Sequence, residues 1–228
     1  EIIGTPRRGL GDTLRSFTRR PEMGALIGAV AVYLFFAVAG GDKFTSSYGS
    51  ASWLNIFADL VIVALPVSLI MIAGELDLSV GSVIAGSSMV TALMSTTFGL
   101  PLWMAMLGGV VFGAIIGFLN GWIIVRTGLP SFIVTLAMMY IVMGLTLGLT
   151  RALAGTVNIA VNPDPWAKSL FGTFIDGKFS VVIFWAIAIA IVVWWIQSFS
   201  RFGNWVYAIG GDAISARAQG IQVGKVKI

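Results

Sequence analysis

Three polar residues stand close together between two long apolar runs: Glu75, Asp77 and Ser79. Carboxylates spaced in this way could act as a general acid and a general base. The chain has no histidine and no cysteine, so neither a histidine base nor a metal-ligand cluster accompanies them. We therefore predict no catalytic residue and no metal site, and we do not expect an enzyme. The three residues fit either a polar pathway or an acidic turn between two helices, with Asp77 or Ser79 capping the second helix.

The composition places these residues in a membrane protein. Of 228 residues, 57% are hydrophobic and only 11% are charged, whereas an ordinary soluble domain has about 25% charged residues. A soluble surface and a disordered chain both need more charge than this. The formal net charge is +4, but the basic residues lie beside apolar runs. That placement indicates contact with membrane lipid and no nucleic-acid partner.

Six apolar runs are long enough to cross a bilayer as helices, which takes about 20 residues each. We predict an all-α, polytopic membrane protein with one transmembrane domain, 24–198, whose outer loop is 151–179. Cations favour the cytoplasmic side, and an N-in, C-in topology places ten of the 14 there. This topology makes 1–23 a basic cytoplasmic segment and 199–228 a second cytoplasmic segment. The predicted spans are Gly24–Gly40, Leu54–Ala73, Ser79–Phe98, Leu102–Val125, Leu129–Thr150 and Ser180–Ser198.

The fourth span has glycines at every fourth position. Small residues on one helix face let two helices approach closely in lipid, where the hydrophobic effect does not drive their association. We predict that this face packs against another helix of the same chain, with a subunit interface as the alternative. The four glycines are Gly109, Gly113, Gly117 and Gly121.

The segment after the sixth span predicts a short cytoplasmic helix, 212–220. Gly210 and Gly211 are expected to break the chain. Asp212 is a good N-cap, and Gly220 supplies the C-terminal stop.

This short helix is expected to dock on something, because two turns alone in water are not stable. Ile214, Ala218 and Ile221 would form one apolar stripe. The stripe could face either the chain's own membrane domain or a separate cytoplasmic protein. No glycine-rich phosphate loop with its lysine occurs in the chain, so any ATP that drives transport would bind to another polypeptide.

Three motifs together resemble those of permease subunits of bacterial ABC importers for ribose, xylose, galactose and related sugars. Gly74–Ser82 is similar to their G-E-x-D-L-S-V-G-S signature, and Leu129–Leu136 to their P-x-F-I-x-T-L segment. The third motif is a Y-A-x-G-G stretch followed by A-A-x-x-x-G-I, and here it corresponds to Arg201–Ile221. The three occur in the family's order and at similar spacing.

The resemblance implies the first part of a ten-helix type II ABC importer permease in the bacterial cytoplasmic (inner) membrane. Further spans follow in that family, so the chain is expected to lack roughly the C-terminal third. No cofactor is expected on this chain, since ATP and magnesium would bind to a cytoplasmic ABC ATPase. The residues implied to couple to that ATPase are Gly210, Gly211, Asp212, Ala216, Arg217, Gly220 and Ile221.

The resemblance also implies two further partners, a second permease subunit and a periplasmic sugar-binding protein that touches the loop 151–179. The predicted function is therefore the translocation path of an ATP-driven importer of monosaccharide-type sugars. The alternative is a truncated, permease-like chain that serves as a structural or accessory subunit of another membrane complex.

Overall fold

A computed structural model describes residues 21–228. The five arginines of the predicted segment 1–23 lie outside this range. Six of the described helices are long and apolar enough to span a membrane, so the predicted all-α, multi-pass fold with six spans is confirmed. These six are α2 (Pro21–Gly40), α4 (Ser47–Ile72), α5 (Val80–Ala92) with its π-helical last turn η1 (Leu93–Thr97), α6 (Leu102–Thr127), α7 (Ser131–Ala154) and α9 (Val182–Phe199).

Shorter elements lie at the two ends of these spans. A small antiparallel hairpin pairs Phe174 with Ser180, and it turns through Asp176 and Gly177, both of which have positive φ. The short helices are α3 (Asp42–Thr45), α8 (Pro165–Phe171), α10 (Arg201–Gly211), α11 (Ala213–Ala218) and α12 (Val223–Lys227), and the strands are β1 (Phe174–Ile175) and β2 (Phe179–Ser180).

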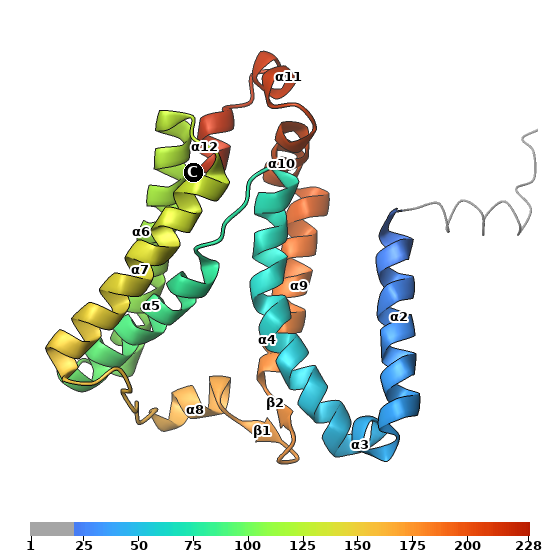
Figure 1. Ribbon diagram of the computed structural model, residues 1–228, viewed down its shortest axis with the longest axis vertical. Helices are drawn as coiled ribbons and strands as arrows, with labels where there is room; N and C mark the ends of the chain where they lie inside the picture. The colour runs from blue at the N-terminus through green and yellow to red at the C-terminus, as the bar shows by residue number, and fades with distance from the viewer. Residues whose placement is uncertain (1–20) are drawn as a thin grey trace, which may run out of the picture.

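The spanning helices form two packed groups (Figure 1). Helices α5, α6 and α7 pack together, and α4 packs along α9. Helix α2 stands apart and joins α4 through α3, with Tyr33 of α2 near Phe44 and Trp53. Helices α10, α11 and α12 lie at one end of the molecule and α3, α8 and the hairpin at the other. The N-in, C-in topology stays a prediction.

The ends of the helices follow local sequence signals. Helix α6 ends at Thr127, the following Gly128 has the left-handed conformation (φ 70°), and α7 begins directly after Pro130. Glycine adopts this conformation without a steric penalty, and proline before the first turn has no N–H to leave unpaired. The link between α6 and α7 is therefore only three residues long, and it makes the two helices neighbours.

One expected break is wrong. Gly210 and Gly211 do not interrupt the chain, because they form the last residues of helix α10. The break comes one residue later, at Asp212, where the backbone is extended (φ −156°, ψ 108°). Gly210 is needed for another reason: a β-carbon there would collide with the carbonyl oxygen of Ile72 at the end of α4. This glycine lets α10 cross the end of α4 in close contact.

Candidate functional site

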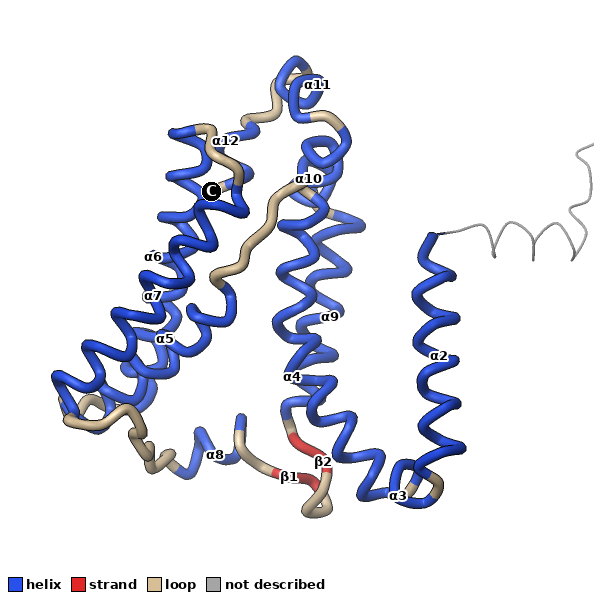
Figure 2. The backbone as a smooth tube through the Cα atoms, viewed as in Figure 1, coloured by secondary structure: helices blue, strands red, loops and turns tan. Residues whose placement is uncertain are grey.

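The connection between α4 and α5 is an extended segment, residues 73–79 (Figure 2). It begins at the α10 end of the molecule and runs back toward the middle, where α5 starts. Backbone that leaves a helix inside a membrane protein needs hydrogen-bond partners, because lipid supplies none. The partners of this segment therefore identify the residues that hold it.

Two hydroxyls of α7 supply these partners. The backbone N–H of Leu76 donates to Ser131 Oγ at 3.0 Å, and that of Leu78 donates to Thr135 Oγ1 at 3.1 Å. Thr135 Oγ1 also lies 3.2 Å from the carbonyl oxygen of Leu76. Ser131 and Thr135 are one helical turn apart and both are buried. They fix the extended segment along the first turn of α7.

Asp77 and Ser79 belong to a second network, which reaches α6. Asp77 Oδ1 accepts from the N–H of Ser79 at 2.8 Å and from its hydroxyl at 2.6 Å. Because the Ser79 hydroxyl donates to Asp77, its oxygen is free to accept from Asn120 Nδ2 at 2.9 Å. Asn120 Oδ1 is left buried with no partner among the described residues. Asp77 therefore orients Ser79 at the start of α5, and the predicted side-chain cap of that helix by Ser79 is absent.

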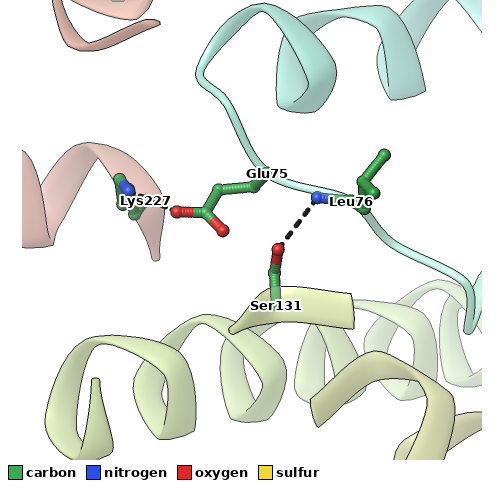
Figure 3. Close-up of polar contacts among 4 residues, drawn as sticks. All are labelled: Glu75, Leu76, Ser131 and Lys227. Carbon is green, nitrogen blue, oxygen red and sulfur yellow. Dashed lines mark hydrogen bonds and ion pairs between the residues drawn. The ribbon is translucent and has the colours of Figure 1, made fainter. Parts of the chain in front are cut away.

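Glu75 pairs with Lys227 of α12, a residue 152 positions later in the chain (Figure 3). Both side chains are largely buried, at 16% and 20% exposure. A buried ionised group is costly unless it is paired. The structure thus joins Glu75, Leu76, Ser131 and Lys227 into one cluster.

The segment 73–79 lines a cavity of about 470 Å³. Its walls combine carboxylates, an amide and hydroxyls with apolar side chains of α4, α6 and α10. The polar wall residues are Glu75, Asp77, Asn120, Ser131, Thr135, Lys225 and Lys227. Within residues 21–228, no group of three or more histidine, cysteine, aspartate or glutamate residues could hold a metal ion.

The predicted short helix is present as α11, and Asp212 caps it. Asp212 Oδ1 accepts from the N–H of Ile214 at 2.9 Å, and Oδ2 accepts from the Ser215 hydroxyl at 2.6 Å. These two hydrogen bonds lower the pKa of Asp212 below its ordinary value of 3.8, and the bond from Ser215 has the larger effect. A lowered pKa in the folded state means that this cap stabilises the protein above pH 3.8. The stabilisation is lost as the pH falls through the lowered pKa.

Helix α11 faces its own chain with a side other than the predicted stripe. Ala216 is buried against Ile209 of α10 and Val223 of α12. In contrast, Ile214 is 79% exposed, and Ala218 and Arg217 are also exposed. Gly220 has a left-handed φ of 86° and ends the turn, and Ile221 packs on the cluster. The apolar Ile214 therefore has no partner in the described part of the chain.

The glycines of the fourth span serve different neighbours. A β-carbon at Gly109 would lie 2.8 Å from the carbonyl oxygen of Ser87, and Gly113 faces Ser87 as well, so both lie against α5. Gly121 faces the backbone of Lys227 and Ile228. A β-carbon at Gly117 would meet no atom of the described residues within 4 Å, and this glycine lines the cavity instead. Close packing within the chain is thus seen at three of the four positions.

The sequence did not single out Asn120, Thr135 or Lys227 as partners of the acidic pair. Asn120 had a usable signal, because an amide in an apolar span needs a partner. Ser131 and Thr135 also had one, because hydroxyls four residues apart share a helix face. Lys227 had none, since its approach to Glu75 depends on how the chain returns after α11.

Comparison with known proteins defines the class. The profile of the branched-chain amino acid transport system, permease component, matches residues 49–228. The chain therefore belongs to this family of ABC transporter permeases and is a multi-pass protein of the bacterial inner membrane. No solved structure matches the chain.

Several curated relatives are named as sugar permeases. The chain is 28% identical over 212 residues to the fructose import permease protein FrcC of Rhizobium meliloti. It is 36% identical over 156 residues to the D-allose transport system permease protein AlsC of Escherichia coli, and 30% identical over 172 residues to the ribose import permease protein RbsC of that organism. The matches cover 91%, 68% and 73% of this chain, and 58%, 45% and 51% of those relatives. The chain spans about half the length of the curated relatives it matches.

Proposed function

We propose that this chain is the membrane-spanning permease subunit of an ATP-driven importer of a monosaccharide-type sugar. Its family and the names of its relatives support a permease, and fructose, allose and ribose are all monosaccharides. ATP and magnesium bind to a separate ABC ATPase, and a periplasmic sugar-binding protein delivers the cargo at the segment 151–179. A second permease subunit completes the translocation path.

The exposed apolar face of α11 carries the proposal. The helix packs against α10 and α12 through Ala216, yet it leaves Ile214 exposed. An exposed isoleucine on a short, capped and anchored helix is suited to insertion into a groove of a partner. In this proposal the partner is the ATPase, so α11 and both chain ends lie on the cytoplasmic side. The coupling segment is Gly210, Gly211, Asp212, Ala216, Arg217, Gly220 and Ile221, with Ile214 as its contact residue.

The test is an Ile214→Asp variant, co-expressed with the ATPase and binding protein of a ribose, allose or fructose importer. The charge should weaken docking, because it replaces an apolar contact with a group that must lose water. We expect ATPase co-purification and uptake of the radiolabelled sugar to fall at least about tenfold, equivalent to about 1.4 kcal/mol of docking energy. Gln222→Asp is the matched control, since it places the same charge at an exposed position outside α11.

Failure of the unchanged protein to bind any of these ATPases or to support uptake would contradict the proposed function. Co-purification with membrane proteins unrelated to transport, and with no ATPase, would favour the accessory-subunit alternative. If the ATPase co-purified equally with Ile214→Asp and with Gln222→Asp, the chain could still be a permease. The proposal that α11 contacts the ATPase would then be wrong.

A further inference from the structure

The Glu75–Lys227 pair lies in a wall between two cavities. The first is the cavity of about 470 Å³, which extends between the spans to Pro66 and Gly117. The second, of about 380 Å³, lies beside α11 and is lined by Ala213 and Arg217. The residues that line both cavities are Glu75, Ile124, Ser131 and Lys227.

This wall is built from residues of two long helices, of one short helix and of the segment 73–79. Ile124 and Ser131 belong to the long helices α6 and α7, which pack together. Lys227 belongs to α12, a five-residue helix that contacts α11 and α10 through the cluster of Ile209, Ala216 and Val223, and that lies against Gly121 of α6. Helix α12 therefore connects Lys227 to α11. On the opposite side, Glu75 belongs to the extended segment 73–79, which hydroxyl contacts hold to α7.

We propose that the Glu75–Lys227 ion pair is a latch that keeps the wall between the two cavities closed. While the pair is formed, the segment 73–79 is tied to α12 and the inner cavity is separated from the space beside α11. When α11 moves, Lys227 moves with it, the pair separates, and both charges face water in a passage that now joins the cavities. The role of this latch in sugar release rests on the proposed function, whereas its effect on access to the inner cavity does not.

The pair suits such a latch because its strength depends on geometry. Two largely buried opposite charges favour one arrangement, and separating them is strongly unfavourable unless water replaces the lost partner of each charge. Separation therefore becomes easy only when water enters as the charges part. Replacing both residues by neutral side chains of similar size removes the attraction and leaves no unpaired charge.

Cysteine accessibility tests the latch directly, because the chain contains no cysteine of its own. Gly117→Cys places a thiol in the inner cavity, where a β-carbon would have no atom of residues 21–228 within 4 Å. A charged, membrane-impermeant methanethiosulfonate reagent is added to membrane vesicles from each side in turn. Ala213→Cys, in the cavity beside α11, identifies the side from which α11 is reached.

We expect slow labelling of Gly117→Cys from the α11 side when the ion pair is intact. Combining it with Glu75→Gln and Lys227→Met should raise the labelling rate at least about tenfold. While the ion pair is intact, the open state is a minor state with a population of about 10% or less, and without the pair it becomes the main one. Labelling of Ala213→Cys should be the same in both backgrounds. Equal rates for Gly117→Cys with and without the ion pair would overturn the proposal.

A swapped pair keeps the test decisive if the neutral pair does not fold. Glu75→Lys with Lys227→Glu restores opposite charges in the reverse order, and slow labelling of the folded swapped protein supports the latch. Fast labelling of that folded protein overturns it. Neither result depends on an ATPase or on uptake, so a failure of the latch and a failure of the proposed function are separate observations.

Discussion

Two ion pairs at opposite ends of the molecule show how burial changes the effect of an ion pair on stability. Asp176 and Lys178 stand two residues apart on the hairpin turn, with 3.7 Å between their charged atoms. Their side chains are 79% and 34% exposed. Glu75 and Lys227 are 152 residues apart in sequence and only 16% and 20% exposed. The first pair forms within one turn, and the second only after the four spans between its residues have packed and the chain has returned through α11.

This difference in burial determines how much each ion pair affects the stability of the fold. Exposed ion pairs contribute about 0–1 kcal/mol, because water competes for both partners and the side chains lose freedom. A buried pair is costly to form, yet removing one partner is far more costly than the pair is worth. The hairpin is instead held by Asn55 of α4, which accepts from the N–H of Ser180 at 2.8 Å and donates to the carbonyl oxygen of Lys178 at 2.9 Å.

The largest expected effect is the loss of one partner of the buried pair. Glu75→Gln leaves Lys227 without its carboxylate and should lower the free energy of unfolding by about 3 kcal/mol. Adding Lys227→Met should restore part of that loss, because the unpaired charge is then gone. Thermal unfolding of the purified chain in detergent measures both variants. A Glu75→Gln protein that unfolds at the same temperature as the unchanged chain would contradict this comparison.

A smaller effect is expected for the hydroxyls that hold the segment 73–79. Thr135→Val keeps the shape of the side chain but leaves the N–H of Leu78 without its partner, at a cost of about 1–3 kcal/mol. Thr150→Val is the matched control on the same helix. Both threonines are 1% exposed, but within residues 21–228 the Thr150 hydroxyl bonds only to the carbonyl of Thr146 in its own helix. The same unfolding assay should separate the two variants, and equal shifts would show that Thr135 does not anchor the segment.

The smallest effect is expected on the hairpin. Asp176→Asn removes the exposed charge next to Lys178 and should change the free energy of unfolding by less than about 0.5 kcal/mol. Asparagine also tolerates the left-handed backbone found at this position (φ 53°). A loss as large as that of Glu75→Gln, measured in the same detergent, would show that burial does not separate the two pairs.

Much of the fold could be predicted because lipid imposes a strong and local rule. Each apolar run must become a helix to satisfy its own backbone, and the predicted spans match the observed helices to within a few residues, apart from the earlier start of α4 and the later end of α7. The cap by Asp212 was predictable for the same reason, since it depends on residues two and three positions away. The Gly210–Gly211 break was wrong because a glycine pair permits a bend but does not require one, and here α10 needs Gly210 for its contact with Ile72.

The candidate site was predictable in its members but not in its contacts. Glu75, Asp77 and Ser79 are unusual beside apolar runs, so their types alone draw attention. Whether they form a turn at the surface or line a cavity depends on residues from α6, α7 and α12. The alternative of a simple capped turn could not be rejected from spacing.

The sequence by itself determined that this is a membrane protein, where its six spans lie, and the resemblance that led to its family. These properties follow from hydropathy, local backbone preference and short motifs, which act over a few residues. Only the tertiary structure decided that Glu75 meets Lys227, that Ser131 and Thr135 hold the extended segment, and that Ile214 stays exposed while Ala216 is buried. The reason is physical: pairing and burial depend on which distant surfaces meet when the helices pack, and no local pattern encodes that meeting.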